Sequence, residues 1–316
     1  MKAQYIIVLL MISMGFVFQN EPKNGIELGE RLFNDPILSL DSTISCASCH
    51  RPAFAFADTA RLSKGVGGKL GERNTPSVMN MLSRPYFFYD GRAASLEEQI
   101  YHPIRNPVEM NLAVKEAVKR VKKDKNYQRW FKNIYGKKPD SVLIATAIAT
   151  FIRSLESVGD APIDLWLNGK DTAKTMSESA IRGRQLFMNK AKCFDCHFTP
   201  DFTADQFRNI GLYDGKTNND VGRFAITHDS ADLGKMKTPG LRNVGRTAPF
   251  MHDGRFKSLK EVVDFYDNPK NFVPDAINVD TLLQKPLGLT EDEKKDLIAF
   301  LHSLTDAKFQ KKKTVK

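Results

Sequence analysis

Two copies of the pattern Cys-x-x-Cys-His constrain the fold and chemistry of this 316-residue chain more than any other feature. They use all four cysteines of the chain. The two copies are Cys46, Cys49 and His50, followed by Cys193, Cys196 and His197. A disulfide framework has no need of a histidine directly after each pair, and a zinc ribbon does not require one after both. The pattern is the attachment signature of c-type haem, with zinc binding or thiol chemistry as the alternatives.

The spacing of the pattern suits covalent haem attachment. Two thiols about one helical turn apart can each bond one edge of a haem, and the adjacent histidine then coordinates the iron. A strong sixth ligand would make such an iron an electron-transfer centre, whereas an open position would let peroxide bind and react. The other four histidines are expected in ordinary hydrogen-bonding, surface or packing roles: His102, His228, His252 and His302.

Segments around the two patterns recur in the same order, which indicates an internal repeat. The matched pairs are "ELGERLF" (27–33) with "IRGRQLF" (181–187), "NTPSVMNMLSRPYFFYDGRAASLEEQI" (74–100) with "KTPGLRNVGRTAPFMHDGRFKSLKEVV" (237–263), and "FIRSL" (151–155) with "FLHSL" (300–304). We therefore expect two like domains, at 21–168 and 169–310, joined in a polar stretch with turn-forming residues.

The periodicity of apolar residues predicts a mainly α fold. Val114, Val118 and Val121 share one helix face. Thr290 and Glu293 form a capping-box pattern at the start of a helix near the end of the chain. Alternating strand patterns are scarce, and Gly and Pro gather in the predicted loops.

The N-terminal segment predicts export. Residues 1–20 contain an apolar run from Tyr5 to Phe18, which is about the length of a signal-peptide core, and no obvious cleavage site follows it. We read this segment as a signal peptide or a retained N-terminal anchor, and we expect a periplasmic protein. The formal charge of +10 suits an acidic partner or an anionic surface, and part of it lies in the basic tail at 311–316. No nucleic-acid partner is expected.

The longer motifs resemble the bacterial dihaem cytochrome c peroxidase family. They span nearly the whole mature chain and read "CASCHRPAFAFAD", "GERNTPSVMN", "YDGRAASLEEQ", "NPVEM", "CFDCH" and "KTPGLRNVGRTAPFMHDGRFKSLKEVVDFY". The resemblance implies two cytochrome-c-like helical domains, each with one covalently bound haem c, and a calcium ion between them. It also implies that peroxide reacts at the N-terminal haem and that the C-terminal haem stores and relays electrons.

Individual site residues follow from the family's motifs. Glu109 in "NPVEM" matches the catalytic distal acid, and Gln99 in "LEEQ" matches its polar neighbour. A carboxylate over the iron can take a proton from one peroxide oxygen and deliver it to the other. The calcium ligands of the family match Asn74, Thr247 and Pro249, whose oxygens are the hard donors that calcium prefers.

Three positions depart from the peroxidases of the family. Val66 stands where members that need reductive activation have a loop histidine, so we expect an open iron at the His50 haem. Tyr89 replaces a tryptophan between the haems, and it either relays electrons or only packs. Tyr266 stands where the peroxidases have a methionine ligand to the second iron, with Met251 as the rival ligand. MauG-like members have tyrosine at that position, so the chain resembles the MauG-like branch there.

These residues predict an exported dihaem peroxidase or oxidoreductase that acts on hydrogen peroxide. Its electrons would come from a small donor protein, a cytochrome c or a cupredoxin, or from an oxidisable organic or protein substrate as in MauG. The resemblance also allows a homodimer. The alternative is a dihaem electron-transfer cytochrome without catalysis, which would need six strong ligands at both irons.

Overall fold

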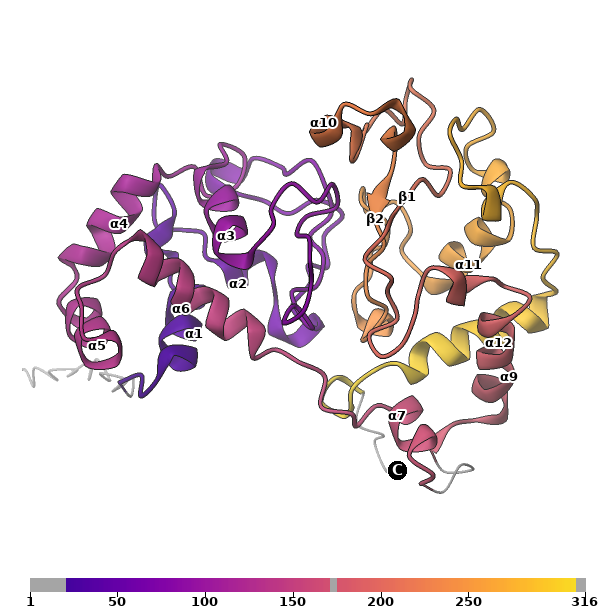
Figure 1. The fold of residues 1–316 in the computed structure, drawn as a ribbon, viewed down its shortest axis with the longest axis horizontal. Helices are drawn as coiled ribbons and strands as arrows, with labels where there is room; N and C mark the ends of the chain where they lie inside the picture. Colours follow the sequence, from indigo (N-terminus) through magenta and orange to yellow (C-terminus); the bar gives the residue numbers. More distant parts are fainter. Residues whose placement is uncertain (1–20, 171–174, 311–316) are drawn as a thin grey trace, which may run out of the picture.

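The computed structural model describes residues 21–170 and 175–310 of the chain. Two helical halves lie side by side, and their loops face each other (Figure 1). The predicted signal or anchor at 1–20 and the basic tail at 311–316 lie outside the described residues. Within the described ranges, no helix combines the length and the apolar character needed to cross a bilayer.

Helices make up most of the regular structure, as the sequence predicted. The first half contains α1 (Gly25–Asn34), α2 (Cys46–Cys49), α3 (Leu96–Arg105), α4 (Val114–Lys123), α5 (Lys125–Tyr135) and α6 (Ser141–Arg153). The second half contains α7 (Pro162–Leu167), α9 (Glu178–Met188), α10 (Phe224–Thr227), α11 (Leu259–Asp267) and α12 (Glu291–Ser303). Short 3-10 turns connect them, and strands β1 (Phe207–Arg208) and β2 (Met236–Lys237) form one antiparallel pair.

Each half is built around one crossing of two helices, and a glycine sits at each crossing. A Cβ atom at Gly29 of α1 would lie 1.9 Å from the carbonyl oxygen of Ala147 on α6. A Cβ atom at Gly183 of α9 would lie 1.9 Å from the carbonyl oxygen of Asp296 on α12. Any larger residue would force the helices apart, so the two matched segments of the repeat carry a glycine for the same packing reason.

The buried apolar residues form one main cluster in each half. Members of the first cluster come from residues 28–152, and members of the second come from residues 161–304. A small third cluster surrounds Phe265 on α11. The domain boundary between residues 168 and 169 stays a prediction, and α7, which precedes it, packs into the second cluster through Ile163.

The Asp-Gly-Arg segments of the repeat form the same turn twice. Phe88 and Met251 occupy equivalent positions and both have a left-handed backbone, with φ of 67° and 71°. Gly91 and Gly254 follow with φ of 69° and 65°. The internal repeat thus extends from the helices to individual backbone angles.

Two helices indicated by the sequence, α4 and α12, form as expected. α4 places Val121 in the first core, although its N-terminus has no side-chain cap. α12 begins after Thr290, whose hydroxyl accepts a hydrogen bond from the Glu293 amide while the Glu293 side chain returns to the Thr290 amide. This reciprocal cap is the capping box that the sequence indicated.

Candidate functional site

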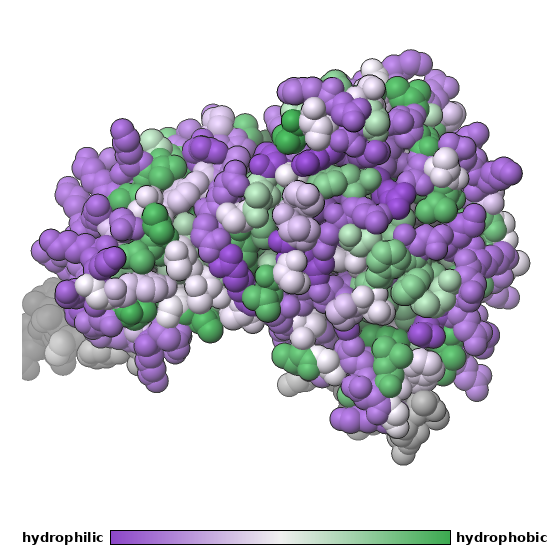
Figure 2. All heavy atoms as spheres, in the orientation of Figure 1, coloured by the Kyte–Doolittle hydropathy of each residue, from purple (hydrophilic) through white to green (hydrophobic). Residues whose placement is uncertain are grey.

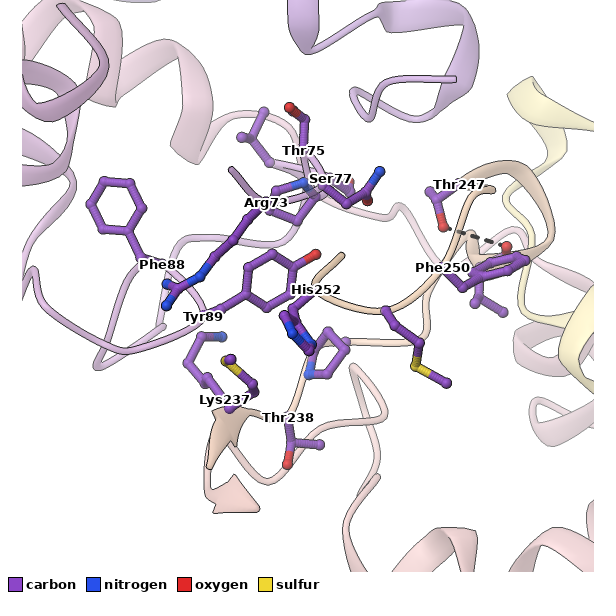
Figure 3. A pocket seen from close by; sticks show the side chains of 18 of the residues that line it. Arg73, Thr75, Ser77, Phe88, Tyr89, Lys237, Thr238, Thr247, Phe250 and His252 are labelled. Carbon is purple, nitrogen blue, oxygen red and sulfur yellow. Dashed lines mark hydrogen bonds between the residues drawn. The ribbon is translucent and has the colours of Figure 1, made fainter. Parts of the chain in front are cut away.

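A cavity of about 660 Å³ is lined by residues from both halves of the molecule. All six residues of the two Cys-x-x-Cys-His patterns contribute to its wall. The other predicted site residues on the same wall are Asn74, Tyr89, Gln99, Glu109, Thr247, Pro249, Met251 and Tyr266. Figure 3 shows one region of this cavity, where side chains of the two halves approach each other. The structure therefore brings together residues that lie more than half the chain apart in sequence.

The two histidines of the patterns are oriented in the same way. His50 Nδ1 lies 3.1 Å from the carbonyl oxygen of Phe56 and 3.1 Å from that of Pro76. His197 Nδ1 lies 2.8 Å from the carbonyl oxygen of Phe202. A ring N–H that donates to a carbonyl fixes the neutral tautomer and leaves Nε2 as a metal ligand. Burial also favours the neutral form, because it lowers the pKa of His50 and lowers that of His197 to about 4.

The accepting carbonyls are turned toward the histidines by unusual backbone angles. Phe56 and Phe202 have φ of 57° and 56°, in the left-handed region that phenylalanine rarely adopts. Each ring is held in a buried aromatic group, formed by Phe33, Phe56 and Phe151 in one half and by Phe187, Phe202 and Phe300 in the other. Packing thus stabilises a conformation that costs on the order of 1 kcal/mol or more.

The four cysteines are free thiols rather than disulfides. Burial raises the pKa of the Cys46 and Cys193 thiols to about 12, so neither is a thiolate. Across the described part of the chain, no three His, Cys, Asp or Glu side chains converge as a metal site. A zinc ribbon needs four converging ligands, so this arrangement does not fit one. Two thiols and a neutral histidine on an apolar cavity wall fit covalently attached haem.

Glu109 is held on the cavity wall close to the first pattern. Asn106 Nδ2 donates a hydrogen bond of 2.6 Å to Glu109 Oε1, so Oε2 is the oxygen left for another partner. Burial raises the pKa of this carboxyl above its ordinary value, while the Asn106 bond and the charge of Arg92 act in the opposite direction. A carboxyl with a raised pKa can both accept and donate a proton near neutral pH.

The loop that carries Val66 is fastened to the Glu109 segment. The Val66 amide donates a 2.8 Å hydrogen bond to the Glu109 carbonyl oxygen. A Cβ atom at Gly65 would lie 2.3 Å from the Val108 carbonyl oxygen, so glycine permits this close approach. The Val66 side chain is buried and is not part of the cavity wall. The wall there is formed by Gly65, which has no side chain to offer an iron.

Gln99 reaches the cavity from α3. Ser95 caps this helix by accepting a hydrogen bond from the Glu98 amide. Pro103 lies in the last turn of the helix, and its carbonyl accepts from the Met110 amide. The helix and the segment after it therefore present Gln99 and Glu109 to the same cavity. His102 lies on the same helix, packs edge to face on Phe88 and does not line the cavity.

Tyr89 and His252 meet where the two halves face each other. They occupy equivalent positions in the repeated turns, and their ring centroids are 6.5 Å apart with the planes tilted by 71°. Figure 3 shows the Tyr89 ring beside His252, with Arg73 nearby. Burial raises the pKa of Tyr89, which Arg73 partly offsets, and burial lowers the pKa of His252. Both rings are therefore neutral near pH 7.

Ion pairs hold this junction together. Arg73 of the first half lies between Asp90, at 2.6 Å, and Asp220 of the second half, at 2.7 Å. Arg84 pairs with Asp201 and Asp205 of the second half. Partly buried ion pairs fix relative orientation better than exposed ones, and the Arg73–Asp220 pair is bidentate. The cavity wall is thus assembled from both halves in one register.

Tyr266 and Met251 line the cavity near the second pattern. Tyr266 lies near the end of α11 and packs against Phe265 of the small third cluster. Burial raises the pKa of its hydroxyl, and Cys193 and Cys196 are close enough to raise it further. Tyr266 therefore lies on the same side of the cavity as the second cysteine pair.

Asn74, Thr247 and Pro249 line the cavity from opposite halves. Asn74 Nδ2 donates hydrogen bonds to the carbonyl oxygens of Ala60 and Arg61, at 3.2 and 3.1 Å. The side-chain oxygen Oδ1 therefore points away from these two carbonyls. The backbone N–H of Asn74 donates a 2.7 Å hydrogen bond to the His252 carbonyl oxygen, which links the first half to the second. Oxygen donors of this kind are those that calcium takes.

Reasoning from the sequence did not identify several residues that orient the site. The carbonyls of Phe56 and Phe202 could have been suspected from the phenylalanine that follows each pattern at a similar spacing. Asn106 lies three residues before Glu109, where an Asx turn is common. No local signal marks Arg73, because its partner Asp220 is distant in sequence.

Comparisons with known proteins place these features in context. The family model described as di-haem cytochrome c peroxidase matches residues 23–172. The chain is 39% identical to the methylamine utilization protein MauG of Methylorubrum extorquens, covering 88% of this chain and 77% of that protein. It is 35% identical to the cytochrome c peroxidase Ccp of Escherichia coli, covering 88% of this chain and 57% of that protein. A solved MauG-like protein associated with microbial copper homeostasis superposes with a TM-score of 0.80 at 30% identity, covering 92% of this chain and 93% of the other.

Proposed function

The chain belongs to the di-haem cytochrome c peroxidase family, and we propose that it uses hydrogen peroxide at the His50 centre to oxidise an organic or protein substrate, with the His197 centre relaying electrons. The chain is a dihaem c-type oxidoreductase with two covalently bound haems, and a non-catalytic electron carrier is not favoured. The observation that carries the proposal is the cavity wall at the first centre. It presents the Glu109 carboxyl, whereas Val66, at the position of the loop ligand, is buried away from the wall and only Gly65 of that loop lines it.

The haems, when bound through their cysteines, supply irons that exchange electrons, and an iron with a free position supplies the site where peroxide reacts. Glu109 Oε2 can take a proton from one peroxide oxygen and return it to the other as the O–O bond breaks, so that the leaving oxygen departs as water. Gln99 can hold peroxide by hydrogen bonding from the same wall. The bond between Val66 and Glu109 supports a resting state in which this position stays open.

Tyr89 is the proposed residue for electron exchange between the two centres. Its place beside His252 at the junction of the halves supports this role. A phenol loses a proton when it is oxidised, and the neutral imidazole of His252, whose ring centroid lies 6.5 Å from that of Tyr89, is a candidate proton acceptor. A tyrosine relay would therefore respond to the protonation of its surroundings in a way that a tryptophan would not.

Tyr266 is the proposed sixth ligand of the second iron, with Met251 as the alternative. Its position near Cys193 and Cys196 supports this assignment. The charge of a bound iron favours the phenolate, which reverses the effect of burial on the hydroxyl. An anionic oxygen ligand favours oxidised iron over reduced iron, which suits the oxidation of a substrate better than the storage of low-potential electrons.

A calcium ion bound by Asn74, Thr247 and Pro249 is the proposed structural link between the halves. These residues come from both halves and line one cavity, which supports the assignment. We further propose a periplasmic location, an electron-donor protein or an oxidisable substrate as partner, and no nucleic-acid partner. A homodimer is compatible with this proposal.

Resting-state spectroscopy of the haem-loaded protein tests the proposal. We expect one high-spin and one low-spin ferric signal before peroxide, and a rapid loss of the high-spin signal after it. Glu109→Gln should keep both resting signals and slow the peroxide reaction by about 100-fold or more. Two low-spin haems in the resting protein would contradict the open first centre.

A second experiment separates substrate oxidation from simple peroxide removal. The 35% identity to a cytochrome c peroxidase makes peroxide removal the second candidate function. Rapid consumption of peroxide with a reduced small cytochrome or cupredoxin would support peroxide removal. Slow turnover with these donors would support substrate oxidation.

A further inference from the structure

The positive charge of the chain is concentrated on two neighbouring helices. Residues 114–138, which contain α4 and α5, hold ten Lys or Arg and two Asp or Glu. The formal net charge of this segment is therefore +8, compared with +10 for the whole chain. The rest of the chain is close to electrically balanced. The function proposed above does not use this segment, and none of its residues lines the cavity.

The lysines of this segment are exposed and mostly lack acidic partners. Lys115, Lys122, Lys123 and Lys125 are all exposed. In the described part of the chain, no acidic side chain lies within 4.0 Å of any of these four ammonium groups. Both acids of the segment are already engaged. Asp124 caps α5, and Glu116 lies 3.3 Å from Lys119.

The basic helices lie at the end of the first half that faces away from the second half (Figure 1). Hydrophilic residues predominate over this end of the molecule (Figure 2). We call the exposed surface of residues 114–138 the basic end. A partner on the basic end would leave the junction of the two halves accessible.

The beginning of the described chain lies against α5, one of these two helices. Glu21 Oε1 pairs with Arg129 Nη2 of α5 at 2.7 Å. A Cβ atom at Gly25 would lie 2.8 Å from the hydroxyl of Tyr135, so the start of α1 abuts the last turn of α5. In the sequence, the apolar run that ends at Phe18 directly precedes this point. The described chain therefore begins beside the basic surface.

We propose that the basic end rests on the anionic headgroups of a phospholipid membrane, beside the point where the apolar N-terminal run joins the folded chain. One weak membrane signal rarely gives stable attachment, and an apolar segment with a basic surface supplies two. Each Lys or Arg near an anionic bilayer strengthens binding by about fivefold, and salt weakens the effect. This orientation turns the second half, with the His197 centre, away from the membrane.

Vesicle partitioning of the full-length, haem-loaded protein tests this proposal. The readout is the ratio of binding to phosphatidylglycerol-containing vesicles over binding to pure phosphatidylcholine vesicles, because insertion of the apolar run contributes to both. The test variant replaces Lys115, Lys122, Lys123 and Lys125 with glutamine. A matched control replaces four exposed lysines of the second half: Lys257, Lys270, Lys285 and Lys308.

At low salt, we expect the wild type and the control to prefer anionic vesicles strongly, and 0.5 M NaCl should remove this preference. The ratio for the test variant should be about 100-fold lower than that of the wild type. A wild-type ratio near one would overturn the proposal and would point to an acidic protein as the partner of the basic end. Equal losses in the test and control variants would also overturn it, because net charge alone would then explain binding.

Discussion

Replacing Asn106 with leucine tests whether Glu109 moves protons at the peroxide site. Asn106 Nδ2 donates to Glu109 Oε1 at 2.6 Å, and this bond stabilises the ionised carboxylate. Burial already holds the pKa of Glu109 above its ordinary value. Loss of the bond removes an opposing influence, so the pKa of Glu109 should rise further.

The size of this rise follows from the strength of the bond. A hydrogen bond to a charged group contributes about 1.5–3 kcal/mol, and one pKa unit corresponds to about 1.4 kcal/mol. We therefore expect the pKa of Glu109 to rise by about 1–2 units. Glu109 must be ionised to accept a proton from peroxide, so the acid limb of the rate–pH profile should move up by the same amount. At pH values below the acid limbs of both the wild type and the variant, the variant should react about 10–100-fold more slowly than the wild type. At pH values above both acid limbs, the two rates should be equal.

Stopped-flow spectroscopy measures this effect as the second-order rate constant for peroxide between pH 5 and 9. Asn218→Leu is a matched control, because Asn218 Nδ2 donates a 2.6 Å bond to Asp214 away from the cavity. The control should retain the wild-type profile. An acid limb that stays in place in Asn106→Leu, or a full rate in Glu109→Gln, would show that Glu109 is not the proton-transfer group.

Two further predictions concern the second iron and the calcium ion. Tyr266→Met should raise the reduction potential of one haem on the order of 0.1 V, because a thioether favours reduced iron more than a phenolate does. A spectroelectrochemical titration that gives an unchanged potential would assign the ligand to Met251 instead. Calcium at 100 times its dissociation constant should stabilise the haem-loaded protein by about 2.7 kcal/mol, so a chelator should lower the unfolding midpoint by several degrees. Asn74→Ala should abolish the response to the chelator, and an equal response in both proteins would remove Asn74 from the site.

Most of the features that could be predicted from the sequence depend on local patterns. The cysteine pairs and the capping box at Thr290 each depend on residues within one or two helical turns, so their spacing is visible in the chain itself. The glycines at the helix crossings were visible only as part of a repeat. The physical reason for these glycines is that an added Cβ atom would lie 1.9 Å from a carbonyl oxygen of the facing helix. This contact is visible only in the three-dimensional packing.

The contacts that orient the site could not be predicted, because they join distant segments. The bond from the Val66 amide to the Glu109 carbonyl links two loops whose sequences carry no complementary signal. The left-handed backbone at Phe56 runs against the preference of that residue, and packing of its ring against Phe33 and Phe151 helps to stabilise it. The pairing of Arg73 with Asp220 depends on how the two halves come together. The resemblance to the family indicated Glu109 and Gln99, but only the fold shows that both line one cavity.

The position of all four thiols on the wall of one cavity has a consequence for the biogenesis of the protein. Cys46 and Cys49 belong to the first half and Cys193 and Cys196 to the second, and the cavity that they share is lined by residues of both halves. An attachment enzyme must reach both thiols of a pair together with a bulky, flat porphyrin. Maturation should therefore precede closure, with each pigment added to an open polypeptide and the final docking of the halves sealing both inside.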